Sequence, residues 1–269
     1  MAGSVQIMGI VNLTDDSFFE GSRRLSSGKE LDEESLASVL ELMVEEGADI
    51  LDLGACSTRP GSDPVEESEE WKRIEKGLKI ASGAVPGVRI SIDTFRPGIV
   101  RKAFDLIGPF IVNDVSGGHA EMLSTVGGLD LEYVCTHTRG TARTMMEMTD
   151  YQDVTAEVEL FFKEFDKKAE RYGIKDWILD PGFGFAKNVE QNWQILRDLG
   201  TFRKFRRRIL AGVSRKSFLY KPLGISPSDA LEATQIANFL ALEGGADILR
   251  VHDIKKAVQT VRLHGLYHS

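Results

Sequence analysis

The sequence predicts an α/β fold, a single-domain (β/α)₈ TIM barrel, and three observations support this prediction. Short apolar runs recur at intervals of a few tens of residues, most of them end at a polar residue, and helix-like stretches separate them. Runs of this kind are typical of the parallel strands of βαβ units. Eight such runs occur in 269 residues, and a barrel of this type typically needs about 250 residues in one piece. We therefore expect one domain over residues 1–269.

Each predicted strand ends at, or contains, polar residues. All strands of a barrel run the same way, so the residues at their carboxyl ends meet at one rim. The sequence therefore predicts one pocket built from residues that are far apart in the chain. The predicted strands and their polar residues are 7–11 with Asn12, 50–53 with Asp52, 90–92 with Asp93, 111–112 with Asn113, 133–135 with Thr136, 177–179 with Asp180, 209–213 with Ser214 and 248–251 with His252.

Four intervening helices, at residues 32–46, 64–84, 155–172 and 228–242, carry an apolar stripe. Acidic residues or a proline stand near the start of most of them, as is usual for a first helical turn. Apolar side chains at helical spacing form one face, and we expect that face to pack on the barrel. The stripes are Leu36, Val39, Leu40 and Met43; Trp71, Ile74, Leu78 and Ala81; Val158, Phe161, Phe162, Phe165 and Ala169; and Ala230, Leu231, Ile236, Phe239 and Leu240.

Composition narrows the function classes. The net charge of −8 and the pI near 5.3 argue against nucleic acid or an anionic membrane as the partner. The two cysteines, Cys56 and Cys135, form no disulfide framework and no zinc spacing, so we expect a reducing compartment. The first ten residues do not resemble a signal peptide, and no apolar run reaches membrane-spanning length. These observations predict a cytoplasmic protein.

Cationic side chains gather at the predicted strand ends. Arg59 lies in a Ser-Thr-Arg-Pro-Gly segment, and Arg215 and Lys216 follow the seventh strand. Arg250 and His252 belong to the eighth strand. Guanidinium donors, hydroxyls and backbone amides match the oxygens of a phosphate or pyrophosphate, and barrels often hold phosphate near these last two loops. Any one arginine could instead be a surface charge or part of a structural ion pair.

A second set of polar residues offers hydrogen-bond acceptors and an amide: Asp93, Asn113 and Asp180. A carboxylate can accept two parallel hydrogen bonds from a planar heterocycle, and an asparagine can serve the opposite edge. Asp180 could equally cap the turn of its Asp-Pro-Gly sequence, and His137 and His252 could be structural. The sequence shows no histidine pair that we interpret as a metal site.

Six short motifs in order resemble the dihydropteroate synthase family. The resemblance runs from the first predicted strand to the eighth, and it implies a barrel that joins a dihydropterin pyrophosphate to p-aminobenzoate. The products would be dihydropteroate and pyrophosphate, on the route to folate, and sulfonamides would compete for the p-aminobenzoate site. The motifs are STRPG at 57–61, SIDT at 91–94, NDVSGG at 113–118, DPGFGF at 180–185, SRKS at 214–217 and RVHD at 250–253.

The resemblance also implies roles for individual residues, Mg²⁺ as the cofactor and a homodimer as the assembly. The catalytic group would be Arg59, Lys216, Arg250 and His252. The implied contacts are Asp93, Asn113, Asp180 and Lys216 with the pterin; Ser57, Thr58, Arg59, Arg250 and His252 with pyrophosphate; Phe183, Arg215, Lys216 and Ser217 with p-aminobenzoate; and Asn12 with Mg²⁺.

Two local departures from the family pattern bear on loop closure and drug affinity more than on the reaction, and two other functions are alternatives. The first loop, residues 14–20, lacks a proline that the family usually has, and Thr136 stands where a methionine is common. A methyltetrahydrofolate:corrinoid methyltransferase is one alternative, although it would give Arg59 and Arg250 no pyrophosphate to bind. A non-catalytic pterin-binding paralogue is the other.

Overall fold

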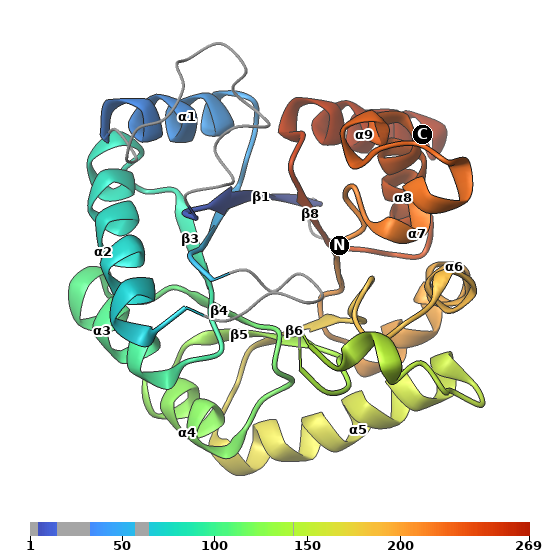
Figure 1. Cartoon of the computed structure of the whole chain (residues 1–269), viewed down its shortest axis with the longest axis horizontal. Coiled ribbons are helices and arrows are strands. Elements are labelled where there is room, and N and C mark those ends of the chain that lie inside the picture. The colour runs from blue at the N-terminus through green and yellow to red at the C-terminus, as the bar shows by residue number, and fades with distance from the viewer. Residues whose placement is uncertain (1–4, 15–32, 57–64, 142) are drawn as a thin grey trace.

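The described residues form one (β/α)₈ barrel, which confirms the predicted fold class. This computed structural model describes residues 5–14, 33–56, 65–141 and 143–269. Helices surround a ring of parallel strands (Figure 1), and no described helix is both long and apolar enough to cross a membrane. The strands are β1 (Gln6–Asn12), β2 (Ile50–Gly54), β3 (Arg89–Asp93), β4 (Ile111–Asp114), β5 (Glu132–Thr136), β6 (Trp177–Asp180), β7 (Leu210–Ala211) and β8 (Ile248–Val251).

The helices alternate with the strands along the chain. Three 3₁₀ turns, η1 (Met145–Glu147), η2 (Leu199–Phe205) and η3 (Pro227–Asp229), accompany them. The α-helices are α1 (Glu33–Glu45), α2 (Glu67–Ala84), α3 (Pro97–Ile107), α4 (Ala120–Gly128), α5 (Val154–Tyr172), α6 (Val189–Arg197), α7 (Ser217–Leu223), α8 (Leu231–Glu243) and α9 (Ile254–Tyr267).

The sheet closes into a barrel at its shortest strand, β7. Its order is β6-β5-β4-β3-β2-β1-β8-β7, with parallel pairing throughout. A parallel bridge between Leu179 of β6 and Ile209, next to β7, joins the first and last strands of this order. The seventh strand was predicted over residues 209–213, but only Leu210–Ala211 forms a ladder.

Alternate strand residues point into the barrel and form levels along its axis. One level is an apolar layer that separates a charged amino-terminal mouth from a polar carboxyl-terminal pocket. Its members are almost fully buried, so the barrel is packed across its middle and is not a channel. The layer consists of Met8, Ile50, Ile111, Val134, Ile178, Leu210 and Ile248.

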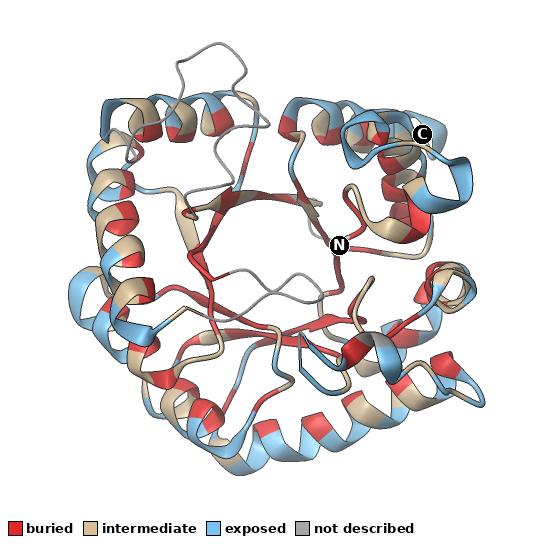
Figure 2. Cartoon of the chain, in the orientation of Figure 1, coloured by how far each residue is buried: buried red, intermediate tan, exposed pale blue. Residues whose placement is uncertain are grey.

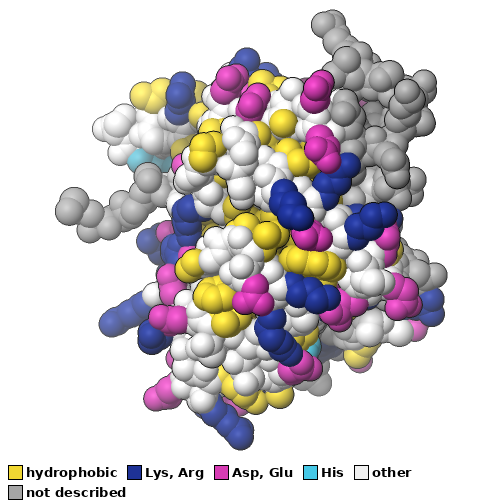
Figure 3. Space-filling view, turned by 90° about the vertical axis from the view of Figure 1, so that its left-hand side faces the viewer, with side chains coloured by type: hydrophobic (Ala, Val, Ile, Leu, Met, Phe, Trp, Pro, Cys, Tyr) yellow, Lys and Arg dark blue, Asp and Glu magenta, His cyan; other side chains and the backbone are white. Residues whose placement is uncertain are grey.

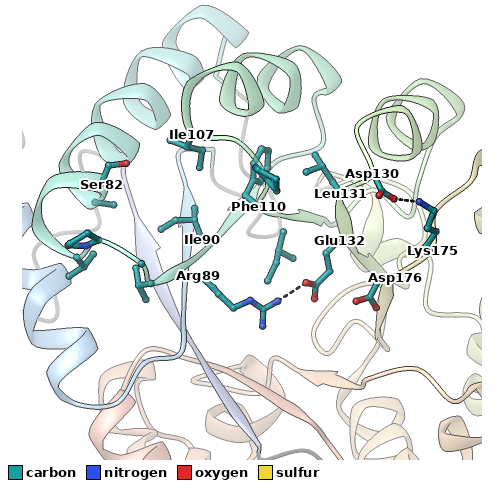
Figure 4. A pocket seen from close by; sticks show the side chains of 17 residues that line it. Ser82, Arg89, Ile90, Ile107, Phe110, Asp130, Leu131, Glu132, Lys175 and Asp176 are labelled. Carbon is teal, nitrogen blue, oxygen red and sulfur yellow. Dashed lines mark hydrogen bonds and ion pairs between the residues drawn. The ribbon is translucent and has the colours of Figure 1, made fainter.

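Paired charges surround the amino-terminal mouth of the barrel. Arg89 Nη2 donates to Glu132 Oε2 at 2.6 Å, and Arg208 Nη2 donates to Glu132 Oε1 at 2.7 Å and to Asp176 Oδ2 at 2.9 Å. Figure 4 shows the hollow at this end, with the Arg89–Glu132 pair beside it. Because its charges pair with one another and it lies opposite the catalytic face of such barrels, we assign this mouth a structural role.

The other strand residues point outward and pack against the helices, as the buried inner faces in Figure 2 show. The predicted stripes of the first three helices do form this interface: Leu36, Ile74 and Phe162 are each at most 1% exposed. Ring contacts reinforce it where the Phe165 and Trp177 centroids lie 4.9 Å apart.

The stripe predicted for residues 228–242 is wrong in part. Ile236 and Leu240 are 62% and 41% exposed, whereas small or polar side chains such as Ala237 and Asn238 face the barrel. The segment also begins with η3 before α8 starts at Leu231. Helical spacing alone could not identify the buried side, since α8 carries apolar residues on both faces.

The side of the molecule that carries α2 has the mixed charge of a solvated surface. Figure 3 shows basic and acidic side chains interspersed on this face. Several of them pair along one helix, as in Arg73 with Glu69 at 2.9 Å and Lys79 with Glu75 at 2.8 Å. Exposed pairs of this kind contribute only about 0.3–0.5 kcal/mol each.

Two adjacent glycines of α4 test the packing of α4 on the end of α5. A Cβ on Gly127 would lie 1.8 Å from the Tyr172 carbonyl oxygen, whereas a Cβ on Gly128 would meet nothing within 4 Å. We expect G127A to lower the free energy of unfolding by about 1–3 kcal/mol, the usual range for overpacking. The matched control G128A should be neutral or slightly stabilising. Equal urea midpoints for the two variants would contradict this packing.

Candidate functional site

The strand ends place the predicted polar residues in one pocket above the apolar layer. Asn12 is in register with Gly54, Gly54 with Asp93, and Asp93 with Asn113. Register neighbours in parallel strands point to the same face of the sheet, and Asp93 faces the interior, where it meets Arg250. Gly54 leaves room in this row, since a Cβ there would lie 3.3 Å from the Asp93 Cβ. Four strands thus bring these side chains to a common rim.

An ion cluster lies directly above the apolar layer. Arg250 Nε donates to Asp52 Oδ2 at 2.7 Å, and Arg250 Nη2 donates to Asp93 Oδ2 at 2.8 Å. Asn113 Nδ2 donates to the same Asp52 oxygen at 3.0 Å. Asp52 is fully buried and Asn113 is 2% exposed, and the half-buried guanidinium of Arg250 joins β2, β3 and β8. The cluster also orients the amide of Asn113.

Two carboxylates keep oxygens available to a ligand. Asp93 Oδ1 is buried and has no hydrogen-bond partner among the described residues. Burial raises the pKa of Asp93 to about 7 despite the neighbouring Arg250, and burial also raises the pKa of Asp180. Asp180 Oδ1 accepts from the Gly182 amide at 2.8 Å, and Oδ2 lies 3.4 Å from the Thr136 hydroxyl. A ligand that donates N–H groups here would satisfy both carboxylates and favour their ionised forms.

The Asp-Pro-Gly turn was the alternative reading of Asp180, and the structure shows both features at one residue. Asp180 does cap its own turn through the Gly182 amide, yet it also ends β6 at the pocket. Gly182 has φ of +71°, and a Cβ there would lie 2.0 Å from the His137 carbonyl oxygen. Only glycine fits this close approach.

Lys187 holds the loop after β6, a role that no sequence motif indicates. The side chain is 2% exposed. Its Nζ donates to His137 Nδ1 at 2.9 Å and to the carbonyl oxygens of Gly182 and Phe185 at 3.1 Å each. Burial lowers the pKa of Lys187 to about 7, and burial together with this cation lowers the pKa of His137 well below its usual value. His137 is therefore a structural acceptor.

An aromatic and cationic wall stands beside Asp180. Lys216 Nζ lies 4.6 Å from the centroid of the Phe185 ring, and its charge acts on both Asp93 and Asp180. Phe183, predicted to contact p-aminobenzoate, is only 1% exposed and stacks on Phe218. The half-buried Phe185 is thus the more accessible ring of this loop, and the sequence motif did not distinguish the two.

Arg215, which is predicted to contact p-aminobenzoate, has structural contacts of its own. Its guanidinium forms two hydrogen bonds of 2.9 Å with the Asp253 carboxylate and two more with the carbonyl oxygens of Pro227 and Ser228. Its backbone has φ of +53°, a conformation that sets the direction of this side chain. Ser217, also predicted for that site, is the half-buried first residue of α7.

His252 lies at the rim as an exposed hydrogen-bonding group. Desolvation and the nearby Arg250 guanidinium lower the pKa of His252 below the ordinary histidine value, which favours the neutral imidazole over the cation that the sequence predicted. Its Nδ1 lies 2.9 Å from the Ser214 hydroxyl. If Ser214 donates to Nδ1, the Nε2–H group remains for a ligand, an assignment that follows from the hydrogen-bond pattern.

Three predicted residues, Ser57, Thr58 and Arg59, lie outside the described residues, as does the altered first loop from Asp15 onward. Their assignments remain predictions.

Asp52 was noticed only as a polar residue inside an apolar strand. An ionisable residue in such a run needs a buried partner, and this signal could have identified it as half of the Arg250 cluster.

Comparisons with known proteins agree with this geometry. Residues 8–252 match the family described as pterin binding enzyme. The dihydropteroate synthase of Escherichia coli K12 is 36% identical over 96% of this chain and 89% of its own length. Among solved structures, dihydropteroate synthase of Thermus thermophilus in complex with 4-aminobenzoate superposes with a TM-score of 0.86, 32% identity and coverage of 99% and 95% of the two chains. The Yersinia pestis dihydropteroate synthase in complex with a sulfonamide superposes with a TM-score of 0.88 and 28% identity. The match covers 98% of this chain and 94% of that chain.

Lys187 makes stability depend on pH. Between the lowered pKa of about 7 and the ordinary value of 10.5, the unfolded chain binds more protons, so this group's contribution to stability increases as the pH rises. K187M should lack that increase, and near pH 10 it should be less stable than the wild type by about 1–3 kcal/mol, because three acceptors lose their donor.

Urea unfolding at about pH 7 and about pH 10 measures this effect. The matched control K163M removes an exposed lysine of α5 and should follow the wild type at both pH values. A K187M variant whose stability rises with pH as steeply as the wild type would contradict the assignment.

Proposed function

Since the chain belongs to the pterin-binding enzyme family, with dihydropteroate synthases among its relatives, we propose that it is a dihydropteroate synthase. It would condense 6-hydroxymethyl-7,8-dihydropterin pyrophosphate with p-aminobenzoate to give 7,8-dihydropteroate and pyrophosphate. The observation that carries this proposal is the pocket itself: Asp93, Asn113 and Asp180 converge above a dry apolar layer, beside Arg250 and Lys216.

The deep part of the pocket suits the pterin. The amino group and ring N–H of a pterin present two parallel donors, which a carboxylate such as Asp180 can accept. Asn113 is held by Asp52 and can bind the opposite edge through its carbonyl oxygen. Lys216 would meet the ring carbonyl, because its charge lies near both Asp93 and Asp180.

The outer part of the pocket suits the pyrophosphate. The free N–H of His252 and the guanidinium of Arg250 would donate to it, together with Ser57, Thr58 and Arg59.

The donor set at the end of β1 also fits Mg²⁺, which prefers oxygen ligands. Asn12 offers an amide oxygen in the row that contains Asp93, and Asp93 Oδ1 has no partner among the described residues. When bound, Mg²⁺ would neutralise charge on the departing pyrophosphate.

The arylamine would enter over the β6 and β7 loops. Phe185 and Lys216 present an aromatic face and a cation there, a combination suited to a benzoate ring with its carboxylate. Phe183 would support this wall from beneath through its stacking on Phe218. Sulfonamides would compete at the same place, as the complex of the Yersinia pestis relative suggests.

One carbon–nitrogen bond forms and one carbon–oxygen bond breaks. The arylamine nitrogen attacks the pterin methylene carbon, the carbon–oxygen bond to pyrophosphate breaks with its electron pair leaving on oxygen, and the nitrogen then releases one proton to solvent. Arg250 and His252 stabilise the departing charge. The ionised Asp180 stabilises positive charge that develops on the pterin, so departure of pyrophosphate can precede attack. A weakly basic arylamine needs no strong general base before it attacks.

Pyrophosphate release tests the proposal. The protein, mixed with the dihydropterin pyrophosphate, Mg²⁺ and p-aminobenzoate, should release one pyrophosphate for each dihydropteroate formed. A corrinoid methyltransferase would release none, and a non-catalytic paralogue would bind the pterin without turnover. Either of these results would refute the proposed activity.

Asp180 provides a prediction for pterin binding. In D180N the amide oxygen can keep the hydrogen bond from the Gly182 amide, but the new NH₂ group would face the N–H donors of the pterin. A mismatched buried pair costs about 1–3 kcal/mol, so the Kd for a bare pterin should rise about tenfold while Tm changes little. Isothermal titration calorimetry measures the Kd. D176N, at the opposite mouth, is the control, and an unchanged Kd in D180N would exclude the contact.

We further propose that the protein acts in the cytoplasm as a homodimer. Two unpaired, buried cysteines, Cys56 and Cys135, fit a reducing compartment. The outer face of α8 and α9 supports the dimer, because it gathers exposed apolar residues that a second copy would cover. They are Ile236, Leu240, Leu263, Leu266 and Tyr267, all at least 41% exposed.

A charged substitution on this face tests the dimer. I236D should convert a particle of twice the 29.8 kDa chain mass into a monomer, because burying an unpaired carboxylate is unfavourable. The matched control L160D alters a residue of α5 that is 57% exposed and should stay dimeric. Light scattering after gel filtration measures the mass, and I236D that remains a dimer would place the interface elsewhere.

A further inference from the structure

Three potential metal ligands meet where α8 and α9 end, far from the pocket. Glu243 is the last residue of α8, His264 lies in the last turn of α9, and His268 is its C-cap. His264 Nε2 lies 2.9 Å and His268 Nε2 2.5 Å from Glu243 Oε1. One ligand atom from each residue lies within 4.8 Å of the other two. The histidines are four positions apart, so both project from one face of the helix.

Several contacts hold the two imidazoles in place. The Phe239 ring meets His264 edge-on at 5.4 Å, and Tyr267 meets His268 edge-on at 4.9 Å. Phe239 and Tyr267 also touch each other, with centroids 5.8 Å apart. An aromatic framework from both helices therefore orients the rings before any ligand arrives, which lowers the entropy that binding must overcome.

The His264 nitrogen that faces the cluster has no proper hydrogen bond. His264 Nε2 is buried and, among the described residues, has no hydrogen-bond partner of normal geometry, although it lies close to Glu243 Oε1. A buried nitrogen of this kind needs an explanation. A cation between the imidazoles and the carboxylate would supply one, because neutral imidazole nitrogens are good metal ligands.

The electrostatic potential around the three side chains also favours a cation. The carboxyl-terminal ends of α8 and α9 both lie at the cluster, and each helix end carries partial negative charge on its last carbonyl groups. Glu243 adds a full negative charge.

We propose that Glu243, His264 and His268 bind one Zn²⁺ ion. Two imidazole nitrogens and one carboxylate oxygen suit Zn²⁺ better than Mg²⁺, and a water would complete a tetrahedron. All three ligands come from one chain, so the site does not depend on the proposed dimer. The sequence was interpreted as lacking a histidine pair for metal, but the spacing of His264 and His268 was overlooked. The ion would fasten the end of α9 to the end of α8.

Metal titration of the intact protein tests the site. After removal of adventitious metal with a chelator, Co²⁺ should bind at one ion per chain and give the visible absorption of tetrahedral coordination. Zn²⁺ should displace it, whereas Mg²⁺ should not. Because the ion binds the folded state, Tm should increase with the logarithm of the Zn²⁺ concentration.

Single substitutions distinguish this site from other surface histidines. H268Q and E243Q should each weaken binding by at least about tenfold, since even outer-shell changes at metal sites cost 10–100-fold. The matched controls H119Q and E232Q alter an exposed histidine and an exposed carboxylate elsewhere and should bind as the wild type does. Absence of tetrahedral Co²⁺ absorption in the wild type, or equal affinity in H268Q, E243Q and the controls, would overturn the proposal.

Discussion

The half-buried guanidinium of Arg250, shared between the buried carboxylates of Asp52 and Asp93, is the interaction on which the pocket depends. It joins the eighth strand to the second and third at the level where the barrel stops being apolar. Without this cation two buried carboxylates would repel each other, and breaking a buried pair of this kind typically costs about 3–5 kcal/mol. The same cation leaves Asp93 Oδ1 unpartnered among the described residues and orients Asn113 through Asp52. The same ion pairs thus stabilise the barrel and place Asp93 and Asn113 for a ligand.

The levels of the barrel interior explain why the polar side chains that can take a ligand gather at the carboxyl-terminal end. The apolar layer closes the middle of the barrel, and the paired charges of Arg89, Glu132 and Arg208 occupy the amino-terminal mouth. A flat polar ring that enters from the carboxyl-terminal rim would therefore rest on the apolar layer with its edges toward carboxylates. The low dielectric of this floor strengthens each hydrogen bond made there. The fixed donors and acceptors then need little rearrangement when charge develops during the reaction.

The sequence predicted the fold and the inner ring of the site because both depend on strand periodicity. Asp93, Asn113 and Asp180 directly end apolar runs, so the barrel topology was enough to bring them together. Arg215 also follows a strand, yet its guanidinium is paired with Asp253, a contact that strand periodicity does not predict. His252 is at the predicted place, but its charge depends on crowding that only the folded structure shows. Lys187 and the buried face of α8 depend on long-range packing, which periodicity does not encode.

A crystal structure of the protein with a bare pterin would test the central claim most directly. We predict that the pterin lies on the apolar layer, with its amino group and ring N–H on the Asp180 carboxylate, its opposite edge on Asn113, and Arg250 still paired with Asp52. A pterin bound without contact to Asp180, or at the amino-terminal mouth of the barrel, would contradict the account.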